Sequence, residues 1–404
     1  MSTDDSTADD DVATEDVAPG DVTADEPAAD STGDSGDDGE TLLSVEDLEV
    51  HYKPGNLIER YLSDRTIKAV DGVDFELEEN DMIILVGESG CGKTTLGKAA
   101  VGLEQPTDGT VEYRGQDIWD SKNNPRNADI EWGEIRRAMQ VIHQDPANAL
   151  NSSRRVRSIL ADPLKKYRTE LGSEEREETI YRYLEYVDMM PPEDYADRYP
   201  HQLSGGEKQR ITLGRALLMN PDVILADEAI SALDVSLRVG MMDLILDLQK
   251  MFKTSYIFIS HDLANARYLA KQAGGRIAVM YLGRIVEIGP PDEIIHNPSH
   301  PYTEVLRWST PTIDPDIAKE QMSEEPPVRQ LDVPDPEDPP SGCHFHPRCQ
   351  YAREACTAED PELFDSGTTE SACFRALPNH EYWDSPELTD VPDDEAVEAT
   401  FADD

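Results

Sequence analysis

The sequence predicts an α/β fold built on a mostly parallel sheet, and three observations support this class. The apolar run Met82–Val86 is followed by a glycine-rich turn and then by a helix-like segment at 96–103. A second apolar run, at 223–226, ends in two adjacent carboxylates. Further short apolar runs alternate with helical patterns along the chain, which is typical of strands joined by crossover helices.

The expected elements follow from this periodicity. In chain order, strands are expected at 43–50 (an edge strand), 67–73, 75–77, 82–86, 110–113, 137–142, 223–226 and 255–259. A hairpin is expected at 277–280 and 284–288, around Leu282-Gly283. Residues 147–215 are polar with a helical pattern, which predicts a helical subdomain inserted between two strands of the sheet.

The ends of the chain differ from its middle in composition. Residues 1–40 contain 15 acidic residues and neither lysine nor arginine. We therefore expect a disordered acidic tail at 1–41, a folded α/β domain at 42–289, and a second acidic tail at 381–404. Residues 290–342 are rich in proline and lack periodicity, so 290–380 is predicted to be an extension that wraps a neighbouring surface.

The overall charge limits the possible partners. The chain of 404 residues carries 84 acidic against 36 basic residues, a net charge of -48. Such a surface lacks the basic face that nucleic acids require, and it suits a salt-rich cytoplasm, so we expect a halophile's protein. No apolar run is long enough to cross a bilayer, which predicts a cytosolic protein that can still dock on a membrane partner.

The glycine-rich turn has the spacing of a phosphate-binding loop. Residues 87–94 match G-x-x-x-x-G-K-[ST] at every fixed position. Glycines let a phosphate approach the backbone, and the N–H groups at the start of the helix point towards it. Lys93 can then reach the β- and γ-phosphates, while the Thr94 hydroxyl can bind Mg²⁺. ATP and Mg²⁺ are therefore the expected ligands.

The second apolar run delivers two acids to the same region. Asp227 and Glu228 follow the strand at 223–226 directly. In a phosphate-loop protein, Asp227 can belong to the Mg²⁺ shell and Glu228 can polarise the attacking water. Adjacent acids after a strand are a weak signal alone and become a strong one downstream of a phosphate loop.

A third motif, Leu203-Ser204-Gly205-Gly206-Glu207, opens a helix at 207–218. Ser204 alone could be a plain helix N-cap. The whole string resembles the signature motif of the ATP-binding-cassette (ABC) ATPases. The resemblance implies a P-loop NTPase of the α/β class: an ABC ATPase cassette with a RecA-like mixed sheet, a helical subdomain and, here, a C-terminal extension with a four-cysteine cluster.

Other motifs of that family occur in the expected order. Gln144 resembles the Q-loop glutamine, and His261 resembles the switch histidine that contacts the γ-phosphate. Tyr52 stands where the family places an aromatic side chain against adenine. The D-loop residues are Ser231, Ala232, Leu233 and Asp234. The resemblance thus implies catalytic roles for Gln144, Glu228 and His261, and Mg²⁺ ligation by Thr94, Gln144 and Asp227. The implied nucleotide-binding residues are Tyr52, Gly87, Glu88, Ser89, Gly90, Cys91, Gly92, Lys93, Thr94, Thr95 and Asp227.

The resemblance also implies how the protein works. Two cassettes would pair head to tail, with each ATP held between one phosphate loop and the partner's signature motif. The stretches 86–93, 226–236, 297–303 and 342–349 look like those of oligopeptide/dipeptide importer ATPases. Members of that group act at the cytoplasmic face of the cell membrane with a homologous or identical second ATPase, two transmembrane permeases and an external solute-binding protein. Importers of nickel chelates or oligosaccharides have similar ATPases, and a soluble ABC ATPase of DNA repair or translation is the competing class.

Four of the five cysteines, Cys343, Cys349, Cys356 and Cys373, lie within 31 residues, with spacing C-x5-C-x6-C-x16-C. In a reducing cytosol such a cluster indicates a metal site more than disulfides. Spacing alone leaves iron–sulfur and Zn²⁺ evenly matched, and reduced thiols without a metal are a third option. The resemblance favours a [4Fe-4S] cluster. Ala229 stands where the family usually has proline, which removes no ligand.

Overall fold

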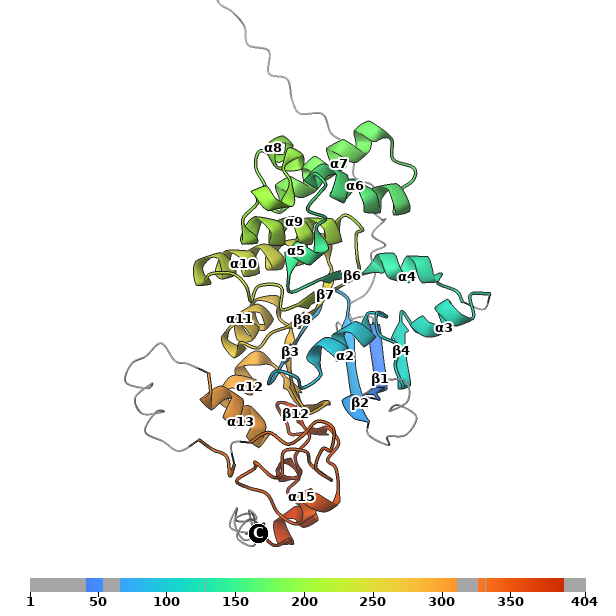
Figure 1. The fold of residues 1–404 in the computed structure, drawn as a ribbon. Coiled ribbons are helices and arrows are strands. Elements are labelled where there is room, and N and C mark those ends of the chain that lie inside the picture. The colour runs from blue at the N-terminus through green and yellow to red at the C-terminus, as the bar shows by residue number, and fades with distance from the viewer. Residues whose placement is uncertain (1–40, 54–65, 127, 311–325, 331, 389–404) are drawn as a thin grey trace, which may run out of the picture. The chain divides into compact units, whose positions relative to one another are not determined.

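The main sheet has eight strands and is mostly parallel, as predicted. The computed structural model describes residues 41–53, 66–126, 128–310, 326–330 and 332–388. The strand order is β11-β12-β10-β9-β3-β8-β7-β6. Figure 1 labels β12, β3, β8, β7 and β6 of this sheet. The parallel part consists of β9 (Arg276–Tyr281), β3 (Met82–Val86), β8 (Ser255–Ile259), β7 (Val223–Asp227) and β6 (Met139–Ile142). The predicted hairpin is confirmed, because β10 (Arg284–Gly289) pairs antiparallel with β9.

A second, antiparallel sheet has the order β2-β1-β4-β5. Its strands are β2 (Ile67–Glu78), β1 (Thr41–Tyr52), β4 (Asp108–Tyr113) and β5 (Gln116–Asp117). The prediction that β1 is an edge strand is wrong, since β1 pairs with β2 on one side and β4 on the other. The two strands expected at 67–77 are a single strand, because Asp74 is exposed and the alternation of buried and exposed residues continues through it.

Both faces of β3 are buried, which explains its unbroken apolar sequence. Ile83 and Leu85 pack in a cluster with the second sheet and α2 (Lys93–Ala100). Ile84 and Val86 pack in a second cluster with α10 (Val235–Phe252) and α11 (Leu263–Ala273). The carboxyl ends of β3, β7 and β8 are therefore held by core packing on both sides, and the candidate site is built at these ends.

The helical segment expected at 147–215 corresponds to five helices. These are α5 (Pro146–Ala149), α6 (Val156–Tyr167), α7 (Ser173–Tyr186), α8 (Pro192–Asp197) and α9 (Gly205–Leu217). The shorter α3 (Ile118–Asn123) and α4 (Trp132–Ala138) precede β6. The five-helix insertion begins after the carboxyl end of β6 and ends before the amino end of β7, which is the neighbouring strand.

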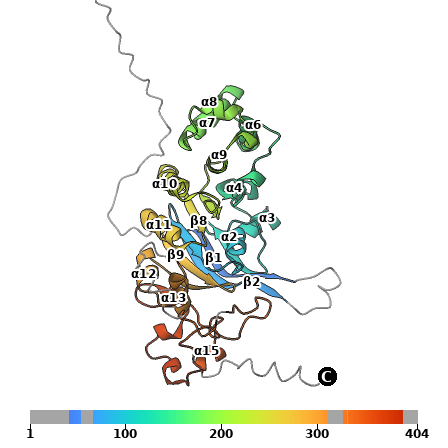
Figure 2. The same ribbon diagram turned by 60° about the vertical axis from the view of Figure 1, so that its left-hand side comes forward.

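The C-terminal extension folds back on its own chain. Helices α12 (Pro291–His296) and α13 (Pro301–Trp308) follow β10, and α12 packs on α11, β9 and β10 (Figures 1 and 2). Further on, β12 (Glu370–Ser371) pairs with β10, and β11 (Phe364–Asp365) pairs with β12. Within the described residues after 325, the short α15 (Ala355–Ala358) is accompanied by two 3₁₀ helices, Phe374–Ala376 and Glu381–Asp384.

The described chain continues past the predicted boundary of the second tail. Tyr382, within the 3₁₀ helix Glu381–Asp384, is buried, and Leu388 packs against the core. The acidic segment expected to be loose from residue 381 is thus in contact with the fold up to residue 388, because it carries these two apolar side chains. The expected tail at 1–40 and residues 389–404 lie outside the described residues.

Candidate nucleotide site

The phosphate loop joins β3 to α2, as its sequence predicts. Gly87 and Gly92 have φ angles of 151° and 108°, and a Cβ on either would lie 2.1 Å or 2.0 Å from a backbone oxygen of a neighbouring strand or loop. Gly90, with φ 84°, faces open space. Two of the glycines are therefore required for packing against the protein, and the third leaves one side of the loop accessible. No side chain caps α2, so its first N–H groups are available to an anion.

Lys93 lies inside the loop. Its side chain is buried, and its Nζ donates to the carbonyl oxygens of Gly87 at 2.9 Å and Glu88 at 2.8 Å. These bonds hold the ammonium group over the turn through which the backbone passes from strand to helix. The charge is thus placed where a phosphate entering the loop would meet it.

Five further residues meet at the carboxyl ends of neighbouring strands. The Thr94 hydroxyl donates to Asp227 Oδ1 at 3.0 Å. Gln144 Nε2 donates to Glu228 Oε2 at 2.6 Å, and His261 Nδ1 lies 3.7 Å from Glu228 Oε1. Glu228 has a positive φ of 49°, which turns its side chain at the end of β7. We call Lys93, Thr94, Gln144, Asp227, Glu228 and His261 the nucleotide edge.

The chemistry of the nucleotide edge fits Mg²⁺. The Thr94 hydroxyl, the Asp227 carboxylate and the Gln144 amide offer hard oxygen donors, which Mg²⁺ prefers. Glu228 is adjacent and hydrogen-bonded to Gln144, so a second carboxylate remains for proton transfer.

The signature residues lie apart from the phosphate loop of the same chain. Ser204 caps α9: its Oγ accepts from Glu207 N at 3.2 Å, and Glu207 Oε2 accepts from Ser204 N at 2.7 Å. A Cβ on Gly206 would lie 3.8 Å from Leu233 and Leu237, beside the D-loop. No hydrogen bond in the described parts of the chain joins 203–207 to 87–95.

The D-loop is a tight turn between β7 and α10. Ser231 Oγ donates to the Glu228 carbonyl at 2.9 Å, and the Leu233 carbonyl accepts from Arg238 at 3.1 Å. Gln209 of α9 donates to the carbonyl of Ala229. Alanine in place of the usual proline therefore leaves a turn that side-chain hydrogen bonds still hold.

Tyr52 is the last residue of β1 and is 38% exposed. Partial burial raises the pKa of Tyr52, and the hydroxyl interacts with Thr95 and Glu104. The ring thus lies beside the start of α2, next to the phosphate loop. Thr95, which was assigned a role only through the family resemblance, interacts with the Tyr52 hydroxyl.

The four clustered cysteines meet at one cavity. Cys343, Cys349, Cys356 and Cys373 line it together with aromatic side chains. Burial raises the pKa of Cys349 to about 12 and that of Cys373 to about 11. A bound cation would favour the thiolate form of both. Cys91 lies elsewhere, in the phosphate loop.

The sequence analysis missed three residues that join the extension to the phosphate loop. Tyr302 and Arg348 contact Glu88, and His344 contacts the turn between β9 and β10. All three lie in stretches that resemble the peptide-importer ATPases, at 297–303 and 342–349, but no motif chemistry assigned them a role.

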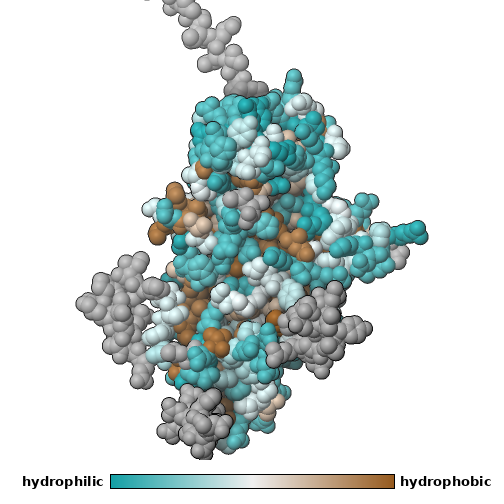
Figure 3. All heavy atoms as spheres, viewed as in Figure 1, coloured by the Kyte–Doolittle hydropathy of each residue, from teal (hydrophilic) through white to brown (hydrophobic). Residues whose placement is uncertain are grey.

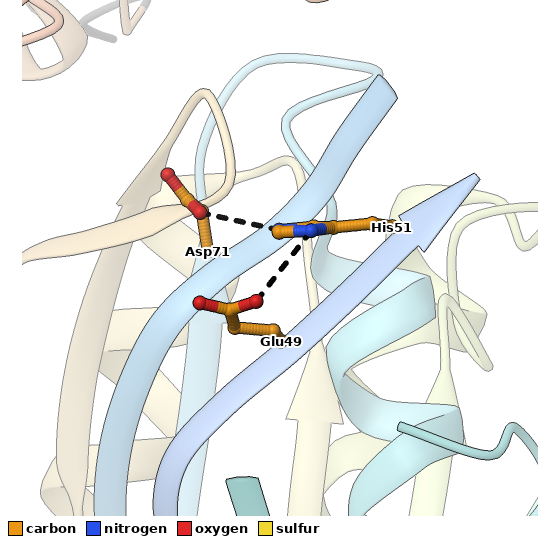
Figure 4. A group of neighbouring side chains, drawn as sticks. All are labelled: Glu49, His51 and Asp71. Carbon is orange, nitrogen blue, oxygen red and sulfur yellow. Dashed lines mark hydrogen bonds and ion pairs between the residues drawn. The ribbon is translucent and has the colours of Figure 1, made fainter. Parts of the chain in front are cut away.

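A trio of metal-binding side chain types lies near Tyr52. The His51 ring is 3.5 Å from Glu49 and 3.2 Å from Asp71 (Figure 4). Asp71 also pairs with Lys68 at 3.2 Å and Arg284 at 3.0 Å. Because two cations already neutralise this carboxylate, we interpret the trio as an ion-pair network of the fold.

Comparisons with known proteins agree with this geometry. Residues 70–231 match the family model for ABC transporters, and residues 286–356 match the model for the C-terminal region of oligopeptide/dipeptide transporters. The chain is 40% identical to the di/tripeptide transport ATP-binding protein DppF of Pseudomonas aeruginosa, over 83% of this chain and 98% of the relative. It is 39% identical to the oligopeptide transport ATP-binding protein OppF of Salmonella typhimurium, over 84% and 97%.

Solved structures show the same fold. The structure of cbiO1 from Clostridium perfringens, part of the ABC transporter complex cbiONQ, matches with a TM-score of 0.54 and 22% identity, over 70% of this chain and 99% of that one. A dimeric structure of a bacterial ABC transporter cassette matches with a TM-score of 0.51 and 26% identity, over 62% and 99%.

The fold and the nucleotide edge define a P-loop ATPase cassette. The chain belongs to the ATP-binding subunits of the ABC transporters, in the group that has the oligopeptide/dipeptide transporter C-terminal region. Among the described residues, no helix has the length and apolar character required to span a membrane.

Proposed function

We propose that this protein is the ATP-hydrolysing, energy-coupling subunit of a peptide importer of the oligopeptide/dipeptide type. The observation that carries the proposal is the nucleotide edge, in which Thr94 contacts Asp227 and both Gln144 and His261 lie against Glu228. The identity of about 40% with di/tripeptide and oligopeptide transport ATP-binding proteins, over nearly their whole length, supports the peptide class.

Each residue of the edge has a chemical task in this proposal. Lys93 and the N–H groups of the loop bind the phosphates, and Thr94, Gln144 and Asp227 hold Mg²⁺. Mg²⁺ held by these three residues would supply positive charge opposite the phosphates. Glu228 accepts a proton from the attacking water, Gln144 and His261 orient Glu228, and Tyr52 stacks on the adenine.

The proposal includes a head-to-tail dimer with an identical or homologous ATPase. Ser204 and the N–H groups at the start of α9 would bind the partner's ATP, which fits their separation from the phosphate loop of their own chain. Hydrophobic atoms also gather on the surface of α10, where Val235, Leu237 and Val239 are exposed directly after the D-loop (Figure 3). Burying this apolar surface would favour pairing.

The permeases would bind in a groove between the sheet and the helical subdomain. This groove, of about 840 Å³, lies between Trp132, His143, Tyr167 and Met219. Its lining includes residues of β6 and His143, which directly precedes Gln144 in the sequence, so a permease segment in the groove could act on the nucleotide edge. Two permeases, an external solute-binding protein and a location at the cytoplasmic face of the membrane complete the proposed importer. The high acidic charge suits a salt-rich cytoplasm.

A [4Fe-4S] cluster is proposed for the four cysteines. Tetrahedral zinc with Zn–S bonds of about 2.3 Å needs sulfurs about 3.8 Å apart. Within the described residues, no three cysteine Sγ atoms lie within 4.8 Å of one another. A four-iron cluster is larger and is held by four thiolates farther apart. All four cysteines line the same cavity, which supports this proposal. The cluster would cross-link the extension.

Uptake assays test the proposed function. A strain that lacks the chain is compared with the same strain carrying either wild type or the Lys93→Ala variant, using labelled dipeptides, longer peptides, nickel chelates and oligosaccharides. We expect only peptide uptake to require the wild-type chain. If uptake of nickel chelates or oligosaccharides depends on Lys93 and peptide uptake does not, the proposed peptide substrate is wrong. A chain that does not sediment with membranes would contradict the transporter role.

A further inference from the structure

The C-terminal extension contacts the phosphate loop at Glu88. The Glu88 backbone N–H donates to the Tyr302 hydroxyl at 2.9 Å. The guanidinium of Arg348 donates to both carboxylate oxygens of the same residue, at 3.1 Å and 3.2 Å. Main chain and side chain of one loop residue are thus both held by residues more than 200 positions away in the sequence.

The two residues of the extension that contact Glu88 are buried, although the Glu88 side chain itself is 32% exposed. Arg348 is 5% exposed and Tyr302 is fully buried. Arg348 lies over the rings of Tyr281 and Phe345, and the Tyr281 and Tyr302 rings pack with their centroids 4.5 Å apart. Packing fixes the donor and the acceptor before they meet Glu88, so little side-chain entropy opposes the interaction.

A second connection runs from the extension to the far end of the loop. The ring of His344 hydrogen-bonds to the Leu282 carbonyl at 3.1 Å. The next residue, Gly283, donates its N–H to the carbonyl of Cys91 at 2.9 Å. The stretch that contains His344 and Arg348 therefore supports the loop at two positions, on both sides of Gly90.

The position of Glu88 matters because Lys93 bonds to it. Lys93 Nζ donates to the Glu88 carbonyl, so a displacement of Glu88 moves an acceptor that holds the phosphate-binding ammonium group. The carboxylate of Glu88 is engaged by Arg348, and its negative charge would repel a phosphate if it were free.

We infer that Arg348 and Tyr302 are positioning residues that hold the phosphate loop in its ATP-binding shape, and that Glu88 is their anchor, not a nucleotide ligand. The extension thereby sets the affinity of the loop for ATP. This inference rests on the proposed use of the loop as the ATP site.

Nucleotide titration of the full chain tests this inference. For Arg348→Gln we expect the Kd and the KM for Mg-ATP to rise about tenfold, the size of a lost charge-assisted hydrogen bond, while kcat changes less than twofold. The kcat is preserved because Arg348 touches neither Glu228 nor Gln144. Arg348→Lys should restore part of the affinity. Arg375→Gln is the matched control, since Arg375 belongs to the same extension but pairs with Glu304.

Two further variants separate the loop contact from folding. Tyr302→Phe removes the hydroxyl acceptor and keeps the ring packing, and it should raise Kd by about threefold. In a Glu88→Gln background, Arg348→Gln should have less effect than in wild type. An unchanged Kd in both Arg348→Gln and Tyr302→Phe, or an equal loss in Arg375→Gln, would overturn the inference. Failure of wild type to bind Mg-ATP would instead overturn the proposed function.

Discussion

The nucleotide edge and the cysteine region (residues 341–388) hold their functional side chains in different ways. At the nucleotide edge, Asp227 ends and Glu228 directly follows a strand, β7, that pairs with a neighbour on each side and is buried along its length. In the cysteine region the backbone is mostly irregular and is joined by single hydrogen bonds, such as that from the Cys343 N–H to the carbonyl of Cys356 at 2.9 Å. Ala355, Phe374 and Tyr382 form a small apolar cluster there.

This difference indicates what each region requires from a ligand. The sheet places the groups of the nucleotide edge without help, because core packing already fixes the ends of its strands. The cysteine region has little regular structure and only a small apolar cluster of its own among the described residues, so cross-links between its thiols would contribute much of its order. Substitutions at the nucleotide edge should therefore lower ATP turnover with little effect on stability. Substitutions of the cysteines should lower stability with less effect on ATP turnover.

The largest expected effect is at the nucleotide edge. Glu228→Gln should lower ATP turnover about 10²- to 10⁴-fold, because the amide cannot accept the proton of the attacking water. Mg-ATP binding and the melting temperature should stay close to those of wild type, and ATP should hold the cassettes as a dimer. Turnover, Kd and thermal unfolding are measured on the same preparations.

Asp222→Asn is the control for this variant. Asp222 lies just before the other end of β7, where its carboxylate interacts with Tyr113 and Arg114. Turnover of this variant should match wild type. Hydrolysis that survives in Glu228→Gln would remove Glu228 from its proposed role.

The second prediction concerns the cysteine region. Wild type purified without oxygen should be brown and contain about four iron atoms per chain. Cys349→Ser should lose the iron and unfold at a lower temperature, since the cross-link is gone. Iron content, visible absorption and thermal unfolding are the measurements.

Cys91→Ser provides a control with the same chemical change in the phosphate loop. Cys91 is buried but does not line the cysteine cavity, so the iron content of the Cys91→Ser variant should equal that of wild type. About one zinc per chain without iron would contradict the cluster and favour a mononuclear site.

The two regions also differ in how far the sequence predicts them. The groups of the nucleotide edge are adjacent to apolar runs, and parallel strands bring their carboxyl ends together, so Asp227 and Glu228 could be placed beside Thr94 in advance. The contacts of Arg348 and Tyr302 with Glu88 could not, because they join side chains far apart in the sequence and follow no local periodicity. The prediction that β1 is an edge strand is wrong for a similar reason. The sequence of a strand does not identify which strands pair with it.

The third prediction separates a helix cap from a ligand at Ser204. In the Glu228→Gln background, ATP-driven dimerisation is followed by light scattering. Ser204→Asp keeps an N-cap acceptor, so α9 should remain as stable as in wild type, but its charge would oppose the partner's phosphates. We expect dimerisation to be lost while ATP binding to the monomer persists.

Ser204→Thr keeps both the cap and the hydroxyl and should dimerise. If Ser204 acts only as a cap, both variants would dimerise equally with ATP. That result would also contradict the proposal that the signature motif completes the partner's site.

The smallest expected effect concerns the junction between the two regions. Arg284 pairs with Asp71 at 3.0 Å and also with Asp360 of the cysteine region at 2.5 Å. Asp71→Asn should lower the free energy of unfolding by about 2 kcal/mol, because Arg284 and Lys68 then lose a buried charged partner. Glu49→Gln is the control. Within the trio, Glu49 pairs with the His51 ring (Figure 4) and is partly exposed, so this substitution should change the free energy of unfolding by less than about 0.5 kcal/mol.

The pH dependence of the stability difference between wild type and Asp71→Asn shows whether the negative charge of Asp71 causes that difference. Burial raises the pKa of Asp71, but the charges of Arg284 and Lys68 outweigh it and hold that pKa below its ordinary value of 3.8. The unfolded chain then takes up the proton first as the pH falls, so the stabilisation is complete above pH 3.8 and is lost below it. Chemical denaturation at pH 7 and at stepwise lower pH should show the gap between wild type and Asp71→Asn closing below pH 3.8. A gap that stays constant would mean that packing, and not the ion pairs with Arg284 and Lys68, joins this part of the cassette to the cysteine region.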